Sequence, residues 1–259
     1  MLVREGGALT TGLGVVVLGG GGGVGACVLR QLASRGHRVV AVGRRKDSLR
    51  RVTAPLRELG YAATEFVLDV AEAGGDDGLA SFTLNTFGRF DCIVNTAAVY
   101  RPSPVTALDE RRWSETMDTN LRGPLLVTSS AARHFVQQGS GRIVHISSIT
   151  ALVSRGGYTL YEASKAGLVA ATRSMAVELA PHGVVVNSVA PGWIRTPMTK
   201  EFVDRASSEA IAAVIPLGRV GEPEEIAAVT CWLAVDSPVF LTGQTIVVDG
   251  GQMSRTPHL

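Results

Sequence analysis

Cysteine is scarce in this sequence. Its three cysteines, Cys27, Cys92 and Cys231, are far apart and form no CxxC pair. An odd, sparse set excludes the disulfide framework that holds small secreted domains together. It also excludes a sequence-local metal site, and the histidines show no metal-ligand spacing either. We therefore expect reduced, buried thiols in a cytoplasmic protein that holds no metal.

A strong charge of one sign and a long apolar run are also missing. The chain has 25 Lys and Arg against 23 Asp and Glu, a net charge of +2. Composition thus gives no reason to expect nucleic acid or an anionic membrane as a partner. No apolar segment approaches the roughly 18 uninterrupted residues of a membrane-spanning helix. Residues 1–12 lack an apolar core followed by a cleavage motif, so we interpret them as an N-terminal arm rather than a signal peptide.

What is present is an alternation of short apolar runs with longer helical stretches over all 259 residues. The runs are rich in Val and Ile without alternating polarity, which is typical of strands buried on both faces. Repeated strand–helix–strand units predict an α/β fold, a doubly wound parallel sheet of seven strands with helices on both faces. We see no linker, and therefore expect one domain, 1–259, in which the less regular region 199–219 is a mobile cap over the substrate. The runs are GVVVLG, RVVAVG, ATEFVLDV, DCIVNTA, GRIVHIS, VVVNSVAPG and QTIVVDGG.

Five consecutive glycines, Gly19 to Gly23, follow the first predicted strand and open the first predicted helix. Gly19, Gly23 and Gly25 have the spacing G-x-x-x-G-x-G. A turn of this kind lets the backbone approach a pyrophosphate, whose charge the helix N-terminus stabilises. A flexible linker is the alternative, although linkers rarely join a valine-rich strand directly to an amphipathic helix.

The end of the second predicted strand bears on the choice of nucleotide. The position at which an acidic residue would bind a ribose 2′-hydroxyl is Gly43, and Arg44 and Arg45 follow it. A guanidinium can pair with a 2′-phosphate, so this segment predicts NADP rather than NAD. Two solvent-facing arginines in a loop are the alternative.

Tyr161 and Lys165 lie four residues apart at the start of a predicted helix, so they share a face. Ser148 ends the preceding strand. A phenol has a pKa near 10, and a neighbouring ammonium together with a positive nicotinamide ring would favour its ionised form. The tyrosine can then exchange a proton with an alcohol oxygen to which the serine hydroxyl also bonds.

With these pieces in place the chain resembles the short-chain dehydrogenase/reductase family in its single-domain form, from about Gly14 to Gly251. The resemblance rests on the glycine turn, on Ser148 and on several short motifs. It implies a Rossmann fold and members' common assembly as homotetramers. The motifs are LDV, NTAA, TNLRG, YEASK, PGWIRTPM, IPLGRVGEPEEIA and TGQTIVVDGG.

The resemblance also implies roles for individual residues. Asn120, Ser148, Tyr161 and Lys165 would form a catalytic tetrad. In it Tyr161 is the general acid–base, Lys165 binds the nicotinamide ribose and depresses the pKa of the tyrosine, Ser148 orients the carbonyl, and Asn120 holds a relay water through its main-chain carbonyl. The implied cofactor contacts are Gly19, Gly23, Val24, Gly25, Arg44, Arg45, Asp69, Val70, Asn95, Ala97, Tyr161, Lys165, Pro191, Gly192, Ile194 and Thr196.

Pro124 stands four residues after Asn120 inside a predicted helix, and proline has no N–H. One hypothesis is that the Asn120 carbonyl is thereby left to bind the relay water; a tolerated kink is the other. Elsewhere the chain departs from the family pattern, with Leu18 where threonine precedes the first glycine and Thr96 and Ala98 in place of asparagine and glycine. His145 stands where asparagine is common.

Together these features predict an NADPH-dependent reductase that converts a ketone or 3-oxoacyl group to a secondary alcohol. The chain is similar to 3-oxoacyl-[acyl-carrier-protein] reductases and to ketoreductases of secondary metabolism, so the carbonyl substrate is either a small molecule or bound to an acyl carrier. One alternative is an alcohol or sugar-alcohol dehydrogenase working in the oxidative direction. Another is a regulator that binds NADP(H) without catalysis.

Overall fold

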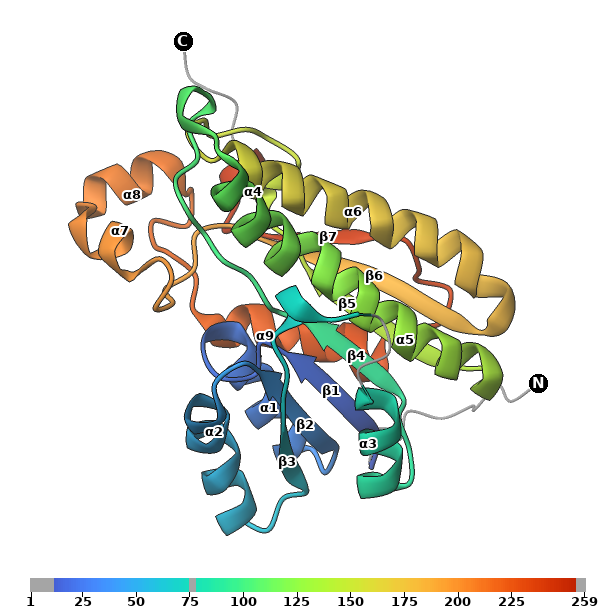
Figure 1. Ribbon diagram of the computed structural model, residues 1–259. Helices are drawn as coiled ribbons and strands as arrows, with labels where there is room; N and C mark the ends of the chain where they lie inside the picture. Colours follow the sequence, from blue (N-terminus) through green and yellow to red (C-terminus); the bar gives the residue numbers. More distant parts are fainter. Residues whose placement is uncertain (1–11, 75–77, 255–259) are drawn as a thin grey trace.

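The computed structural model describes residues 12–74 and 78–254, so the arm expected at residues 1–12 lies, but for its last residue, outside the described residues. At its centre is one parallel sheet with the strand order β3-β2-β1-β4-β5-β6-β7 (Figure 1). The predicted seven-stranded, doubly wound parallel sheet is confirmed. The strands are β1 (Gly14–Leu18), β2 (Arg38–Gly43), β3 (Ala63–Val67), β4 (Cys92–Asn95), β5 (Gly141–Ile146), β6 (Val184–Pro191) and β7 (Thr245–Val248).

The central strands are apolar throughout because helices cover both of their faces. Along β1, Val15 and Val17 belong to the apolar cluster on one side of the sheet, and Val16 and Leu18 to the cluster on the other. All four side chains are inaccessible to solvent. Full burial of such a side chain contributes about 1.5–3 kcal/mol, so β1 is a main source of the stability of the fold.

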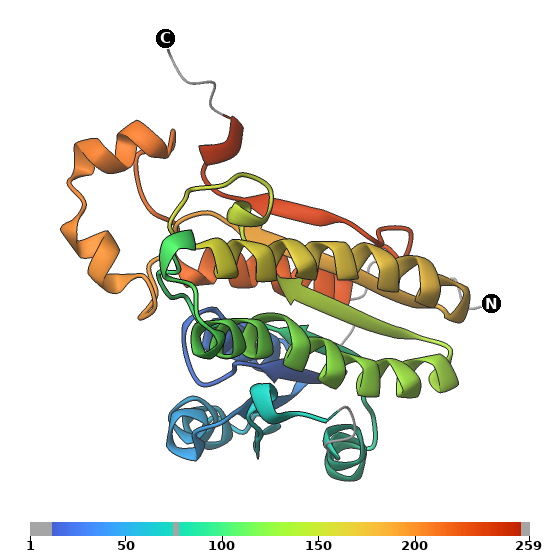
Figure 2. The same cartoon turned by 45° about the horizontal axis from the view of Figure 1, so that its top comes forward.

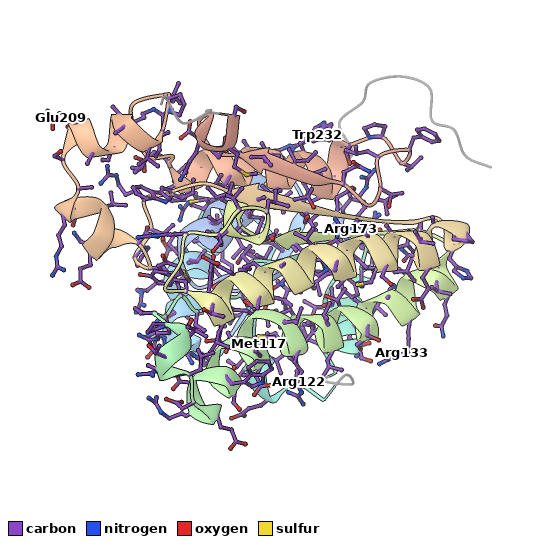
Figure 3. The ribbon with its side chains drawn as sticks, turned by 90° about the horizontal axis from the view of Figure 1, so that it is seen from above. Met117, Arg122, Arg133, Arg173, Glu209 and Trp232 are labelled. Atoms are coloured by element: carbon purple, nitrogen blue, oxygen red, sulfur yellow. The ribbon has the colours of Figure 1, made fainter. Side chains whose placement is uncertain are left out.

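Helices α1 (Gly23–Ser34), α2 (Lys46–Glu58) and α9 (Pro223–Cys231) cover one face. Helices α3 (Leu79–Phe87), α5 (Gly123–Gln138) and α6 (Thr159–Leu179) cover the other. Figures 1 and 2 both show α5 and α6 side by side, and Figure 3 shows Arg133 and Arg173 on their outer surfaces. Glycines in the left-handed conformation, Gly78 and Gly88, bound helix α3 at either end.

The long helix expected between the fourth and fifth strands has an interruption in the structure. Helix α4 (Glu110–Met117) runs into a π-helical turn at Asp118–Arg122, and α5 follows. The Gly123 amide donates to the carbonyl of Asp118, five residues back. Pro124 thereby falls in the first turn of α5, where the missing N–H costs least. The hypothesis that the Asn120 carbonyl binds a water stays a prediction.

The region 199–219, expected to be less regular, contains two short helices, α7 (Lys200–Arg205) and α8 (Ser208–Val214). They project from the side of the sheet, with Glu209 at their outer end (Figure 3). Val203, Ile215 and Val220 form a small apolar cluster beneath them, against which Trp193 packs. The mobility of this segment stays a prediction. In the described ranges, no helix has the length and apolar character needed to cross a membrane.

Candidate active site

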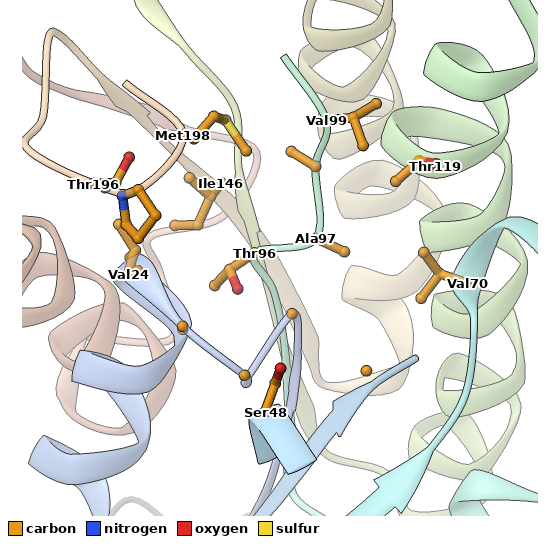
Figure 4. Close-up of a pocket in the computed structure, with 18 of the residues that line it drawn as sticks. Val24, Ser48, Val70, Thr96, Ala97, Val99, Thr119, Ile146, Thr196 and Met198 are labelled. Atoms are coloured by element: carbon orange, nitrogen blue, oxygen red, sulfur yellow. The ribbon is translucent and has the colours of Figure 1, made fainter. Parts of the chain in front are cut away.

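A cavity of about 630 Å³ opens where the carboxyl ends of the parallel strands meet. It lies at the point where the strand order reverses, because β1 pairs with β2 on one side and with β4 on the other. Ligands of doubly wound folds bind at such a switch point. Figure 4 shows Val24 and Thr196 on one side of the cavity, Val70 on the opposite side, and Thr96 and Ala97 between them.

The glycine run forms the turn between β1 and α1. Gly19 has φ +79°, a left-handed conformation that favours glycine, and a Cβ there would lie 2.7 Å from the Thr96 hydroxyl. A Cβ on Gly25 would lie 2.6 Å from the same hydroxyl. The run is a folded turn, as the spacing predicts, and the linker alternative is wrong.

The other glycines of the run differ in how freely they could vary. Gly22 has only open space where a Cβ would be. A Cβ on Gly20, in contrast, would lie 2.8 Å from Leu29 and 3.1 Å from Ala41. Gly20 is a variable position in the G-x-x-x-G-x-G spacing. In the structure, the packing of α1 against β2 leaves no space for a side chain there.

A cluster of guanidinium groups borders the cavity beyond the end of β2. Arg44 and Arg45 are exposed and line it as expected. Ser48 and Arg51, on the first turns of α2, line it as well, and the Arg51 guanidinium donates to the Ser48 hydroxyl at 3.1 Å. Arg51 was not among the residues predicted from the sequence. Its spacing of three residues from Ser48 on a helix that starts at the arginine pair is the signal that could have found it.

Asp69 and Val70 line the cavity on the side of β3, and the Asp69 carboxylate accepts a hydrogen bond from the Ala71 amide at 3.0 Å. Ala97 lines it too. Asn95 is the exception among the expected cofactor contacts, since it is buried behind the wall and is not part of the lining. Its Oδ1 accepts from the Ala97 amide at 3.2 Å, so it shapes the wall through its neighbour.

The loop after β6 forms the far side of the cavity. Pro191, Gly192, Ile194 and Thr196 all line it, as expected. Thr199 holds the loop in shape: its hydroxyl accepts from the Thr196 amide at 3.1 Å and also bonds the carbonyl of Ile194.

Ser148, Tyr161 and Lys165 come together at one end of the cavity. The Lys165 Nζ lies 5.8 Å from the centre of the Tyr161 ring and donates to the carbonyl of Ile146 at 2.8 Å. The Ser148 hydroxyl accepts from the amide and the hydroxyl of Thr150. Lys165 thus reaches from α6 to the last residue of β5, and Thr150 holds the Ser148 hydroxyl just beyond that strand.

Burial sets the acid–base character of this end. It raises the pKa of Tyr161 to about 12, and the hydrogen bond with Ser148 offsets only part of the rise. Burial also lowers the pKa of Lys165 to about 8. Lys165 is not among the causes of the Tyr161 shift, since its ammonium donates to the carbonyl of Ile146. That the lysine depresses the pKa of the tyrosine when a nicotinamide is bound stays a prediction.

Asn120 is fully buried in the π-helical turn, behind the cavity wall. Its side chain accepts from the Val99 amide at 2.7 Å and donates to the Val99 carbonyl at 2.9 Å. It also donates to the Ser164 hydroxyl at 3.1 Å, and this hydroxyl donates to the carbonyl of Tyr161 at 2.7 Å. Asn120 thus ties the loop after β4 to the helix turn that carries Tyr161.

The departures from the family pattern have structural consequences. The Thr96 hydroxyl donates to the carbonyl of Leu18 at 2.7 Å, so it joins the ends of β1 and β4 beside the glycine turn. His145 is fully buried in β5 with no hydrogen-bond partner on either ring nitrogen. Burial, assisted by the charge of Lys165, lowers its pKa to about 4, so the ring is neutral at neutral pH. The structure offers no reason for Ala98.

Comparison with known proteins agrees with this geometry. A family model described as enoyl-(acyl carrier protein) reductase matches residues 20–253. The short-chain reductase protein NovJ of Streptomyces niveus is 36% identical over 244 residues, 92% of each chain. The chain belongs to the short-chain dehydrogenase/reductase family.

Other members of the family are similarly close. The 3-oxoacyl-[acyl-carrier-protein] reductase FabG of Thermotoga maritima is 34% identical over 91% of this chain and 96% of its own. A gluconate 5-dehydrogenase from Burkholderia cenocepacia, crystallised with NADP and tartrate, superimposes with a TM-score of 0.90 at 30% identity, covering 96% of this chain and 98% of that one. As a short-chain dehydrogenase/reductase, the protein is an NAD(P)-dependent oxidoreductase that acts on CH–OH and C=O groups.

Proposed function

We propose that this protein is an NADPH-dependent reductase that converts a ketone or a 3-oxoacyl group to a secondary alcohol, with Tyr161 as the general acid. The observation that carries the proposal is the buried end of the cavity, where Ser148, Tyr161 and Lys165 face one space. The similarity to FabG and to NovJ supports a carbonyl substrate.

The residues present fit a dinucleotide. A Cβ on Gly19 or Gly25 would collide with Thr96, so these two glycines let the turn fold closely against the end of β4. Gly22 and Gly23 of the same turn line the cavity without a side chain, where backbone amides would approach a pyrophosphate. Asp69 and Val70 would border the adenine. Bound NADPH would supply the hydride.

The guanidinium cluster favours NADP over NAD. No acidic side chain stands directly at the end of β2, where Gly43 precedes Arg44 and Arg45. Arg51 adds a third cation on the same side of the cavity. Guanidinium groups pair with phosphate through two parallel hydrogen bonds, which suits a 2′-phosphate. The solved gluconate 5-dehydrogenase with NADP is consistent with this choice.

The proton chemistry favours the reductive direction. A group with a pKa of about 12 holds its proton at neutral pH, and a donor is what a carbonyl oxygen needs as it becomes an alcohol. Ser148 would bond the same oxygen. Lys165, whose pKa is about 8, is still mostly protonated at pH 7 and would bind the nicotinamide ribose. Asn120 would hold a relay water through its carbonyl.

A polyol dehydrogenase is the second candidate, because the chain superimposes closely on the gluconate 5-dehydrogenase. It would use the same residues in the oxidative direction, with Tyr161 accepting the proton. The two are separated by comparing turnover of NADPH with ketones and 3-oxoacyl thioesters against turnover of NADP with gluconate and other sugar acids. We expect the larger kcat/KM in reduction.

The decisive experiment follows reduced-nicotinamide absorbance with a panel of ketones and 3-oxoacyl thioesters. Tyr161→Phe should lower kcat by about 10²–10⁴-fold, the usual contribution of a general acid, while NADPH binding is retained. Retained activity in Tyr161→Phe would overturn the assignment. Tight NADPH binding with no turnover by the wild-type protein on any carbonyl or alcohol would favour a non-catalytic NADP(H)-binding regulator instead.

We extend the proposal to a homotetramer. β7 is an edge strand of the sheet, and Val247 on it is 40% exposed. Phe240, in the loop before it, is fully exposed. An edge strand with apolar neighbours suits pairing with a second copy. Light scattering should give four times the monomer mass, and Phe240→Ser with Val247→Ser should reduce it.

A further inference from the structure

Two loops are fastened together beside Tyr161, next to the residues that line the cavity, one after β4 and one before α6. The Ser103 amide donates to the carbonyl of Gly157 at 2.8 Å, and the Thr159 amide donates to the carbonyl of Ser103 at 3.3 Å. The Ser103 hydroxyl accepts from the Leu160 amide at 3.0 Å. Ser103 itself is buried. The side chains carried by these two loops are therefore held in a fixed relation to each other.

Those side chains form an aromatic group in contact with the proposed general acid. The rings of Tyr100 and Tyr158 are stacked, with centroids 4.3 Å apart and an angle of 4° between their planes. The edge-on contact between Tyr100 and Tyr161 has a centroid distance of 4.8 Å and an angle of 82°. Tyr100 thus connects the loops directly to the reacting end of the cavity.

Arg155 is held by this aromatic group. Its Nη1 donates to the Tyr100 hydroxyl at 2.9 Å. The centre of its guanidinium lies 5.1 Å from the Tyr158 ring and 5.5 Å from the Trp193 ring. Cation–π contacts of this kind favour the charged group at that position. Three segments, after β4, before α6 and after β6, therefore converge on one arginine.

The backbone of Arg155 is fixed as well. The Glu162 carboxylate, in the first turn of α6, accepts from the Arg155 amide at 3.0 Å and from the Ser154 hydroxyl at 2.7 Å. A cation that is ordered before binding loses little conformational entropy when it meets an anion. An exposed but ordered guanidinium, connected through one tyrosine ring to the proposed acid, has the properties of an anion-binding group for the substrate.

We propose that Arg155 binds a carboxylate or phosphate carried by the carbonyl substrate, with Tyr100, Tyr158 and Trp193 positioning its guanidinium. The substrate class is then an oxo acid or a phosphorylated ketone, or an oxoacyl thioester whose carrier arm has a phosphate. This inference rests on the proposed reductase function, because it names the substrate of the same site. A guanidinium recognises either anion through two parallel N–H donors.

The test compares substrates matched in length. 4-Oxopentanoate is paired with its methyl ester and its primary amide, and kcat/KM is measured at saturating NADPH. The wild-type protein should prefer the acid. Arg155→Met should lower kcat/KM for the acid by about 10- to 100-fold and leave the neutral ketones within about threefold, since one charged hydrogen-bonded pair is lost. Tyr100→Phe should lower kcat/KM for the acid by a smaller factor and leave kcat/KM for the neutral ketones unchanged.

Arg101→Met is the matched control, because Arg101 is another exposed arginine on the loop after β4. It should leave the ratio of acid to neutral kcat/KM unchanged. An equal loss on acid and neutral ketones in Arg155→Met would indicate a structural role and overturn the proposal. If the ratio of acid to neutral kcat/KM is the same in Arg155→Met as in the wild-type protein, the proposal is also overturned.

Two further arms separate the anion sources and the two proposals. A greater Arg155 dependence with an oxoacyl-CoA thioester than with 4-oxopentanoate supports the phosphate of a carrier arm, and the reverse supports a free carboxylate. Calorimetric titration of 4-oxopentanoate into the protein with NADP provides a readout without turnover. Arg155-dependent binding in a protein that reduces no ketone supports the anion site while the reductase proposal fails. If the protein reduces neutral ketones, and neither the binding nor the turnover of the acid depends on Arg155, the reductase proposal is supported while the anion site fails.

Discussion

The two ends of the cavity differ in the chemical groups that line them and in how far those groups are exposed to water. At the glycine turn and the end of β2, the lining is backbone together with the exposed guanidiniums of Arg44, Arg45 and Arg51. At the other end, Lys165 is almost inaccessible and Ser148 nearly so. The first end uses close backbone approach and hydrated charge, while the second uses ionisable groups removed from water.

This difference predicts different consequences of substitution. Exposed charges cost little stability, so changes among the arginines should alter nucleotide preference and leave folding intact. A buried ammonium disfavours folding, so a change at the catalytic end should alter activity and stability in opposite directions.

The largest effect is expected for Lys165→Met. Loss of the ammonium should lower kcat by about 10²–10³-fold, as removal of a group that supports proton transfer does. Because burial lowers the pKa of Lys165 from 10.5 to about 8, the unfolded chain binds this proton more tightly than the folded protein. Urea unfolding at pH 7 should therefore show Lys165→Met to be more stable by about 1–3 kcal/mol.

The same linkage fixes the pH dependence. The stability of the wild-type protein should gain a contribution as pH rises from about 8 towards 10.5, and Lys165→Met should lack it. Lys200→Met serves as control, since this lysine lies on the surface in an ion pair with Asp204. A variant at position 165 that is less stable than wild type at pH 7 would contradict the assigned cost of burial.

The nucleotide end is tested by comparing a glycine of its turn with a glycine outside the cavity. Gly25→Ala would place a methyl group 2.6 Å from the Thr96 hydroxyl, so the turn must shift. We expect the Kd for NADPH to rise by about 10²-fold, the scale of an ångström-sized displacement. Gly74→Ala should leave the Kd unchanged, because Gly74 is not part of the cavity lining and its Cβ meets open space. Equal effects at the two positions, measured by fluorescence titration, would remove the argument from close backbone approach.

A smaller effect is expected at the guanidinium cluster. Arg44→Ala and Arg51→Ala should each raise the Kd for NADPH by about 10-fold, since each loses one charged hydrogen-bonded pair. The Kd for NADH should hardly change. Arg50→Ala is the matched control on the same helix, where Arg50 forms an ion pair with Glu65. Should both nucleotides weaken equally in the Arg44 and Arg51 variants, the cluster would not select NADP.

The fold was predictable from the sequence because the central strands are Val-rich runs between helical stretches, and their burial on both faces leaves that pattern little ambiguity. The three residues at the catalytic end were also predictable. Ser148 comes two residues after the end of β5, close to the strand end that the sequence predicts, and the spacing of Tyr161 and Lys165 on one helix puts both on one face. Local spacing carries this information.

Features that depend on contacts between distant segments were not predictable. The grouping of Tyr100, Tyr158 and Arg155 comes from two loops fastened by Ser103, and no local pattern indicates it. The raised pKa of Tyr161 follows from how much protein surrounds it, which spacing does not report. The π-helical turn before Pro124 likewise reflects packing around Asn120 rather than helix propensity.

Two buried histidines give the smallest and most selective prediction. Burial lowers the pKa of His145 from 6.5 to about 4 and that of His37 in the same direction, and the charge of Lys165 contributes only at His145. In this pH range the two histidines are protonated in the unfolded chain but stay neutral in the folded protein, so stability should fall as pH falls from 6.5 towards 4. His145→Asn should reduce this slope, which for one histidine is at most about 1.4 kcal/mol per pH unit.

Lys165→Met should reduce the contribution of His145 to the pH dependence of stability and leave the contribution of His37 unchanged. Thermal unfolding of the single and double variants between pH 4 and 7 would measure both contributions. If Lys165→Met left the His145 contribution unchanged, the histidine and the lysine would not be electrostatically coupled. The acid sensitivity of the catalytic end would then come from burial alone.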